Sequence, residues 1–144
     1  MENKTAVFID CENIQNPQKI KLSLAYIQKN YENVINRTII GNFLYNNKIM
    51  KLIKSEDLIA IPTKVGENSA DMRICWEVLQ VLKKHPHLTH ICLMTNDSDY
   101  SMLLELLHKY GIQITIFGFK NQLPNSLLKY KTVAMDDLVS QFFD

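Results

Sequence analysis

Short apolar runs recur along the chain at fairly regular intervals. Five of them are rich in β-branched and aromatic residues, which is typical of strands in a covered sheet. These runs occupy residues 5–9, 37–44, 58–62, 90–94 and 112–117. Two of them are followed closely by acidic residues, the first by Asp10 and the fourth by Asp97 and Asp99.

The segments between these runs place apolar residues at helical spacing. The predicted helices cover residues 17–28, 69–84 and 100–110. Gly111 is placed to end the third helix, since glycine readily adopts the left-handed conformation after a helix. Weaker patterns predict a short helix or loop over 46–54, and short helices over 123–128 and 135–143.

The second predicted helix carries several apolar side chains. Ser69 or Asn68 is available as its N-cap. Its apolar positions are Ala70, Ile74, Val78, Leu79 and Leu82. We also assign Trp76 to the core of the protein.

Alternation of apolar strands with helices indicates an α/β protein. We predict a three-layer α/β/α sandwich with a mostly parallel central sheet and right-handed crossovers. At 144 residues the chain fits one domain, which we assign to residues 1–144. Ligands of such sheets bind outside the carboxyl ends of the strands, where the strand order switches direction.

Composition narrows the class of protein. The chain is 47% hydrophobic and 22% charged, as ordinary globular proteins are, and its net charge of +1 gives no global basic field. Any nucleic-acid binding must therefore come from a local patch.

The apolar run near the N-terminus is too short for a signal peptide or a membrane span. Three cysteines without CxxC spacing indicate neither a disulfide framework nor a zinc site, so we expect a reducing, cytoplasmic location and no membrane partner.

Acidic residues follow two of the predicted strands. Asp10 and Glu12 come after the first, and Asp97 and Asp99 come after the fourth. If both strands are central, these acids converge at one edge of the sheet, and Asp71 at the start of a helix would join them. Crowded carboxylates raise one another's pKa unless a cation lies among them.

Oxygen ligands of this kind suit Mg²⁺ or Mn²⁺, which share their sites with substrate phosphates. The chemistry that follows is metal-assisted hydrolysis of a phosphodiester, with one or two ions. The structural alternative is that Asp97 to Asp99 only cap the following helix. Either acidic group alone favours that alternative, whereas four carboxylates at two strand ends favour a metal site.

Specific segments resemble the NYN domain family, the LabA-like or DUF88 branch of the PIN-like nucleases. Residues 7–13, VFIDCEN, are similar to its opening strand followed by Asp-x-x-Asn, and residues 94–100, MTNDSDY, are similar to its Ser-Gly-Asp-Ser-Asp-Phe. Lys64 and then Ala70-Asp71-Met72 resemble the Lys and Val-Asp-Val between them, and residues 126–138 resemble its closing Ser-Leu and Ala-Asp stretch.

The resemblance implies a PIN-like fold, Mg²⁺ or Mn²⁺ in an acidic pocket, and ribonuclease activity. Carried over to this chain, Asp10, Asp71 and Asp97 hold the metal and Asp99 is a fourth carboxylate. Asn13 would position an acid or the scissile phosphate.

Some family members carry a further acid six residues after the middle Asp, which is Glu77 here. Six helical residues rise about 9 Å and turn about 120° away, so we rank Glu77 low. Glu67 and Glu12 stay open as additional ligands. The chain also departs from the family at Asn96, which replaces a glycine and would tolerate a left-handed turn, and at Tyr100, which we expect to be a buried aromatic.

Basic and polar residues near this edge are candidates for contacting nucleic acid. Lys48, Lys51 and Lys54 would share a broad face of a helix, although a solvated face explains them equally well. Lys64 is favoured by the resemblance, and Arg73 less so. The remaining candidates for nucleic-acid contact are Asn13, Thr95 and Ser98.

The leading hypothesis is a metal-dependent nuclease acting on RNA, in which the catalytic residues are Asp10, Asn13, Asp71, Asp97 and Asp99. The first alternative is a non-catalytic nucleic-acid-binding or regulatory module with the same fold. A weaker alternative is a Toprim-like domain using Glu12, Asp97 and Asp99, which leaves Asp10, Asn13 and Asp71 without roles. A homodimer is compatible with a domain of this size, but no segment of the sequence requires one.

Overall fold

A computed structural model describes residues 2–64 and 70–139 of the chain. The strands are β1 (Thr5–Asp10), β2 (Val34–Gly41), β3 (Ile59–Pro62), β4 (His90–Met94), β5 (Gln113–Gly118) and β6 (Lys131–Ala134). The α-helices are α1 (Pro17–Asn30), α2 (Asn47–Glu56), α3 (Ala70–Lys84) and α4 (Ser101–Lys109). Short 3₁₀ turns are η1 (Ser98–Tyr100), η2 (Lys120–Gln122), η3 (Asn125–Leu127) and η4 (Met135–Asp137).

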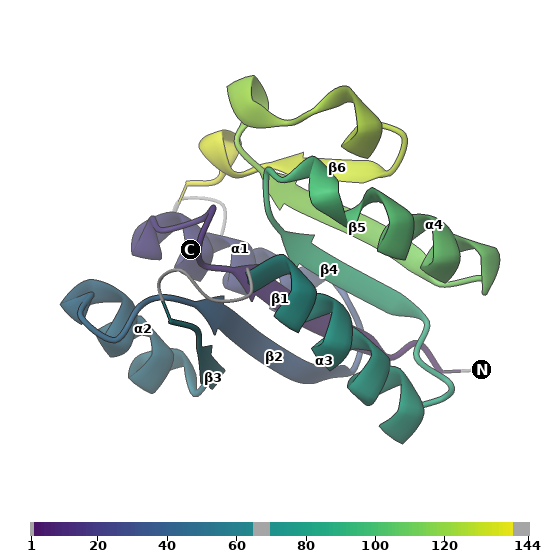
Figure 1. The fold of residues 1–144 in the computed structure, drawn as a ribbon, viewed down its shortest axis with the longest axis horizontal. Coiled ribbons are helices and arrows are strands. Elements are labelled where there is room, and N and C mark those ends of the chain that lie inside the picture. The colour runs from purple at the N-terminus through teal and green to yellow at the C-terminus, as the bar shows by residue number, and fades with distance from the viewer. Residues whose placement is uncertain (1, 65–69, 140–144) are drawn as a thin grey trace.

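The six strands form one sheet in the order β3-β2-β1-β4-β5-β6 (Figure 1). Every neighbouring pair is parallel, which goes one step beyond the mostly parallel sheet that the sequence predicts. The order switches direction between β1 and β4, the two central strands. Their carboxyl ends therefore lie together at the place where such sheets bind ligands.

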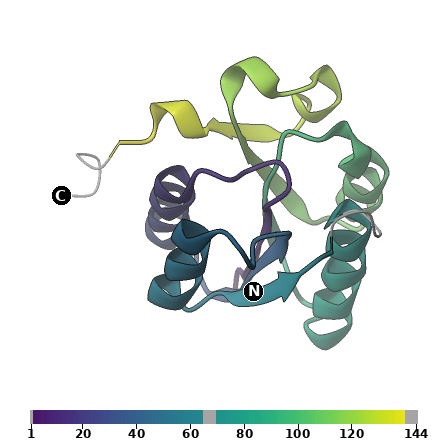
Figure 2. The ribbon, with the colours of Figure 1, turned by 60° about the vertical axis from the view of Figure 1, so that its left-hand side comes forward.

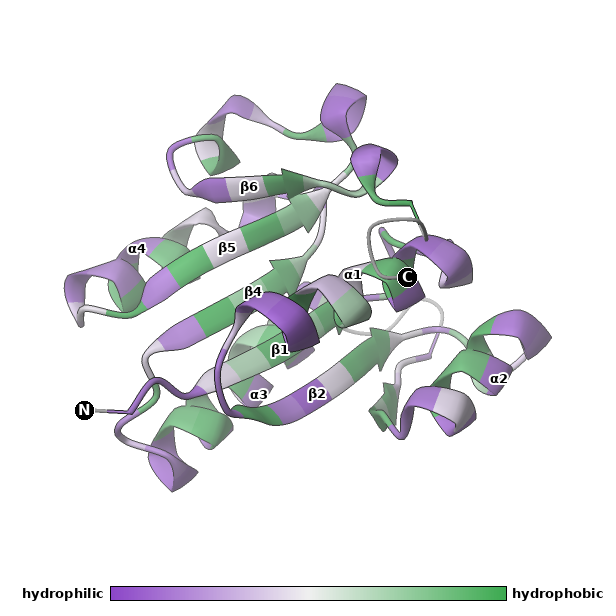
Figure 3. Ribbon diagram, turned by 180° about the vertical axis from the view of Figure 1, so that it is seen from behind, coloured by the Kyte–Doolittle hydropathy of each residue, from purple (hydrophilic) through white to green (hydrophobic). Residues whose placement is uncertain are grey.

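Helices cover both faces of the sheet, which confirms the predicted sandwich. Figure 2 shows α1 and α2 on one side of the strands and α3 and α4 on the other. Each layer has its own apolar core, one containing Phe8, Ile74 and Leu104 and the other containing Ile9 and Ile20. The middle of the central strands is correspondingly hydrophobic in Figure 3. Burial of successive β1 residues on opposite faces explains why this strand is apolar throughout.

Local signals fix several boundaries. The side chains of Asn16 and Asn46 accept backbone hydrogen bonds and cap α1 and α2, so the segment left open as helix or loop is a helix. Gly111 follows α4 with φ of 82°, as predicted. The proposed caps Asn68 and Ser69 lie outside the described residues.

Four predictions need correction. Strand β2 begins three residues before the predicted start, because Asn33, with φ of 48°, turns the chain directly before Val34. The strand ends at Gly41, three residues before the predicted end. Strand β6 was missed, since it is an edge strand of only four residues, of which the first two are polar. Within 123–128 only the turn η3 forms, and from 135 to 139 only the turn η4.

The fourth correction concerns α3. Trp76 is 57% exposed, although the sequence pattern assigns it to the core, and Leu79 is 45% exposed. The buried side of the helix is formed instead by Ala70, Ile74, Val78 and Val81. Trp76 and Leu79 lie on the opposite side of the helix, because residues two and five positions after Ile74 point away from the side on which it lies. The large apolar face of α3 is therefore turned to solvent.

None of the helices in the described part of the chain is both long and apolar enough to span a membrane.

Candidate metal centre

The predicted meeting of the acidic segments is observed at the carboxyl edge of the two central strands. Asp10 is the last residue of β1, and β4 ends at Met94, which pairs with Ile9. The chain then turns through Asn96 into η1, whose N-cap is Asp97. Residues distant in sequence thus come together because β1 and β4 are neighbours.

Three carboxylates form a compact cluster at this edge. One oxygen from each of Asp71, Asp97 and Asp99 lies within 4.8 Å of the others. Asp71 belongs to the first turn of α3, and its Oδ1 accepts the Met72 N–H. Asp97 Oδ1 accepts the Asp99 N–H at 2.9 Å, which fixes the turn. We call these three residues the acidic cluster.

The acidic cluster has no cationic partner. No ion pair within residues 2–64 and 70–139 involves any of its members. The negative charge of Asp97, followed by a small desolvation and the charge of Asp71, raises the pKa of Asp99. Three hard oxygen donors without a counterion are a ligand set that fits Mg²⁺ or Mn²⁺.

Asp10 lies below the acidic cluster and is not a member of it. It is fully buried, and burial raises its pKa despite hydrogen bonds that favour the charged form. Its Oδ2 accepts from Asn13 Nδ2 at 2.6 Å and from Thr95 Oγ1 at 2.8 Å. Thr95 Oγ1 in turn accepts the Asp97 N–H at 3.1 Å. Asp10 is therefore connected to the cluster through Thr95.

Tyr100 is the buried aromatic that the sequence predicts, with no exposed surface. Its hydroxyl has no partner in hydrogen-bonding geometry among the described residues. Burial and then the charge of Asp10, with a smaller effect from Asp71, raise its pKa. The side chains of Tyr100 and Asp10 affect each other's pKa, so this buried hydroxyl belongs to the base of the site.

Asn96 does not have the left-handed backbone that would explain the family's glycine, since its φ is not among the positive values. Its side chain instead accepts the Phe119 N–H at 3.0 Å and donates to Gln122 Oε1. Gly118 makes room for it, because a Cβ at position 118 would lie 2.5 Å from Asn96 Oδ1. In this chain Asn96 connects the loop after β4 to the loop after β5.

The other sequence candidates lie in different places. Ser98 is exposed between two members of the cluster, Lys64 is exposed after β3, and Glu12 is exposed with its N–H bonded to Asp10. Glu77 pairs with Arg73 at 3.1 Å on the outside of α3 and is not part of the cluster. Glu67 lies outside the described residues.

Two adjoining grooves that the sequence did not indicate follow the same edge toward α2. Their volumes are about 600 and 440 Å³, and their side chains are mainly amides. The lining residues that they share are Gln15, Asn46 and Lys48. Asn13 and Gln122 close the end nearest Asp10 and Asn96, while Tyr45 at the other end is 97% exposed. The only sequence signal for this feature is an aromatic residue in an Asn-rich turn after a strand.

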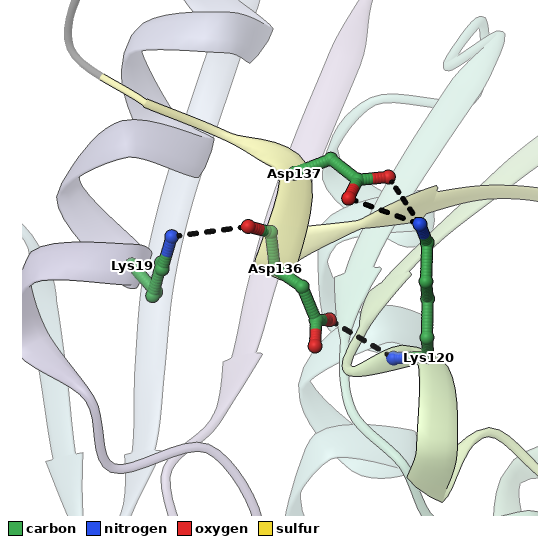
Figure 4. Close-up of polar contacts among 4 residues, drawn as sticks. All are labelled: Lys19, Lys120, Asp136 and Asp137. Carbon is green, nitrogen blue, oxygen red and sulfur yellow. Dashed lines mark hydrogen bonds and ion pairs between the residues drawn. The ribbon is translucent and has the colours of Figure 1, made fainter.

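The closing stretch that resembles the family's Ala-Asp segment lies outside the acidic cluster. Asp136 Oδ1 accepts the Lys120 N–H at 3.0 Å, and Lys120 pairs with Asp137 at 2.8 Å (Figure 4). Lys19 of α1 donates to the carbonyl oxygens of Asp136 and Leu138. These contacts attach the C-terminal segment to α1 and to the loop after β5.

The fold and the acidic edge define a three-layer α/β/α protein with a carboxylate site at the carboxyl end of a parallel sheet. The sequence model of the NYN domain matches residues 4–136, so the chain belongs to the NYN domain family of the PIN-like nuclease superfamily. The comparison with curated proteins finds no match.

A solved structure supports the fold independently. A protein of unknown function from Vibrio parahaemolyticus is similar with a TM-score of 0.74 and 16% sequence identity. The similarity covers 96% of this chain and 97% of the other. At this level of identity the likeness shows the shared fold alone.

Proposed function

We propose that this protein is a Mg²⁺- or Mn²⁺-dependent nuclease that hydrolyses RNA. The observation that carries the proposal is the acidic cluster, in which three carboxylates from two distant segments lie within 4.8 Å of one another and form no ion pair among the described residues. Membership of the NYN family supports nuclease chemistry at this cluster, because the family belongs to the PIN-like nucleases. A purely nucleic-acid-binding module would gain nothing from acids that repel phosphate.

Asp71, Asp97 and Asp99 hold the ion in this proposal. The chemistry that a divalent ion would supply there is a lower pKa for a water molecule and stabilisation of negative charge on the phosphate. The backbone contacts of Asp71 and Asp97 fix their carboxylates before any ligand arrives, so less ordering is needed on binding.

Asp10, Asn13 and Thr95 position this cluster. Thr95 links the buried Asp10 to the backbone of Asp97, so a change at Asp10 is transmitted to the residue that caps η1. Asn13 is exposed and donates to Asp10 while facing the first amide groove. Direct contact of Asp10 with metal, which the sequence predicts, would bring the ion to a buried carboxylate that already accepts three hydrogen bonds.

RNA lies along the carboxyl edge of the sheet, from the acidic cluster into the amide grooves. Gln15 and Asn46 offer donors and acceptors to bases or sugar hydroxyls, and Lys48 offers a positive charge to a phosphate. Tyr45 is placed to stack on an unpaired base. Lys51, Lys64 and Ser98 remain candidates for further phosphate contacts.

The test is the Asp97→Asn variant assayed with labelled RNA and Mn²⁺. Asparagine keeps the oxygen that accepts the Asp99 N–H, so the turn should be retained while one ion ligand loses its charge. We expect the cleavage rate to fall by roughly 100-fold or more. Asp57→Asn is the matched control, because residue 57 has φ of 53°, which asparagine tolerates, and lies outside the cluster.

Cleavage by Asp97→Asn at the rate of the Asp57→Asn control would reject the proposal. A DNA oligonucleotide of the same sequence, assayed in parallel, tests the choice of RNA. Faster cleavage of DNA than of RNA would leave the nuclease assignment standing and overturn the substrate.

A further inference from the structure

The two helices on one face of the sheet expose a large apolar surface. On α3 the exposed side chains recur at helical spacing, and α4 repeats the pattern. The six residues and their exposed fractions are Met72 60%, Trp76 57%, Leu79 45%, Met102 83%, Leu106 45% and Tyr110 78%. We call this surface the α3–α4 face. The helices on the other face expose only Met50 among large apolar residues, at 37%.

The two helices that carry these rows lie on the same side of the sheet. Helix α3 and the turn leading into α4 begin together, since Asp71 and Asp99 belong to one cluster, and both helices run along the same side of the sheet (Figures 1 and 2). Below the surface, Cys75 and Leu82 of α3 pack against the core that contains Leu103 of α4. Both helices thus cover one shared apolar core.

The exposed area is large enough for a protein interface. If each side chain offers on the order of 200 Å² when free, the exposed parts of the six amount to roughly 700 Å². Monomeric proteins seldom expose a continuous apolar patch above a few hundred Å² without using it. A standard interface buries about 800 Å² from each partner, and Trp, Tyr and Met are enriched at such interfaces.

We propose that the α3–α4 face pairs with the same face of a second copy of this chain, giving a two-fold symmetric dimer. Helices α3 and α4 of both copies then form a double layer between the two sheets, with Trp76 as the main energetic contact. Because Met72 directly follows Asp71, the interface ends at the border of the acidic cluster. The cluster itself stays outside the interface.

Part of the charge at the border of the face is neutralised within the chain. Arg73 is paired with Glu77, and Glu105 is paired with Lys129. Lys83 and Lys109, which are exposed on the same two helices, have no ion pair among the described residues, so the pairing of two copies rests on the apolar area.

Sedimentation velocity over a range of concentrations tests the pairing directly. The full chain should be a dimer at micromolar concentration, and Trp76→Glu should weaken association by roughly 30-fold or more. Leu106→Glu is a second variant that should have the same effect from the other helix. Leu44→Glu is the matched control, since Leu44 is 55% exposed but follows β2 and lies outside the face.

Trp76 also provides a spectroscopic readout, because it is the single tryptophan of the chain. Its emission should move to the blue on association and to the red on dilution. Circular dichroism checks that each variant is folded. A wild-type monomer at all concentrations, or a dimer that survives both substitutions, overturns the proposal. So does a monomer whose Trp76 emission is quenched by single-stranded RNA, because the face then belongs to nucleic acid.

Discussion

The molecule places two groups of aspartates after the carboxyl ends of its strands, and their surroundings are opposite. Asp71, Asp97 and Asp99 have one another and backbone N–H groups as neighbours, without an ion pair in the described part of the chain. Asp136 and Asp137 are each held by Lys120, one through its backbone N–H and the other through its ammonium group (Figure 4). The first group therefore has no positively charged side chain paired with it among the described residues, whereas the second group is bound by Lys120.

The directions of the pKa shifts express this difference. The hydrogen bond from Lys120 lowers the pKa of Asp136, while the neighbouring carboxylates raise that of Asp99. Asp136 and Asp137 have a structural role, because they connect the C-terminal segment to the loop after β5. Acids held together against their repulsion offer a cation a favourable place to bind, and this contrast distinguishes the candidate site from a structural contact.

The largest expected effect is stabilisation by metal. Mn²⁺ at a hundred times its dissociation constant should stabilise the wild-type fold by about 2.7 kcal/mol. That corresponds to a rise in melting temperature of roughly 5–10 °C for a chain of this size. Asp71→Asn should lose most of the rise, because the cluster then has two charged ligands. Thermal unfolding with and without Mn²⁺ measures this.

The matched variant is Asp137→Asn, which removes an equivalent charge from the second group. Its melting temperature should still rise with Mn²⁺ as in the wild type, since Asp137 already has Lys120 as its partner. An equal loss of the metal effect in both variants would mean that the ion is bound diffusely, and the contrast between the two groups would fail.

The sequence alone predicts a strand or a buried residue well when the cause lies in neighbouring residues, and poorly when it lies in residues that are distant along the chain. Residues 5–9 and 90–94 were recognised as strands because burial on both faces demands continuous apolar runs. Strand β6 escaped because an edge strand of four residues needs no such run. Trp76 was misplaced because a large apolar residue on a helix is usually buried, and only the positions of Ile74 and Val78 show that it faces outward.

The same limit applies to the site. Strand ends could be aligned from the sequence, which brought Asp97 and Asp99 to the edge near Asp10. The position of Asp10 relative to the acidic cluster depends on Thr95, whose hydroxyl donates to Asp10 and accepts the N–H of Asp97. Such a contact joins residues 85 positions apart and leaves no trace in local spacing. The amide grooves were missed for the same reason, since their sides come from three separate loops.

A smaller effect is expected when the second group loses its tie to α1. Lys19→Met keeps the aliphatic stem but removes the donor to the carbonyl oxygens of Leu138 and Asp136. Partial exposure discounts the loss, so we expect a decrease of about 1 kcal/mol in the free energy of unfolding. Urea denaturation measures it. Stabilisation by Mn²⁺ should be unchanged, because Lys19 is not near the acidic cluster.

Lys21→Met on the same helix is the control for this substitution, since residue 21 is exposed and forms no hydrogen bond or ion pair with the described residues 131–139. Equal destabilisation by the two variants would show that the loss of lysine from α1 matters, and that the contact with Leu138 does not.

The smallest effect is a pair of pH profiles of opposite sign in the metal-free protein. The pKa of Asp99 is raised above 3.8 by its acidic neighbours, so its ionisation opposes folding, and stability falls as pH rises from 3.8 through the raised pKa. Asp99→Asn should therefore have a higher melting temperature than the wild type at pH 7, and the two melting temperatures should converge near pH 4.

The pKa of Asp136 is lowered, so its charge stabilises the fold above pH 3.8, and this stabilisation is lost only as the pH falls through the lowered pKa. Asp136→Asn should melt lower than the wild type at pH 7 and converge with it only in stronger acid. Calorimetry of both variants between pH 3 and 7 decides the matter, because a lower melting temperature for Asp99→Asn at neutral pH would show that the acidic cluster is not held against repulsion.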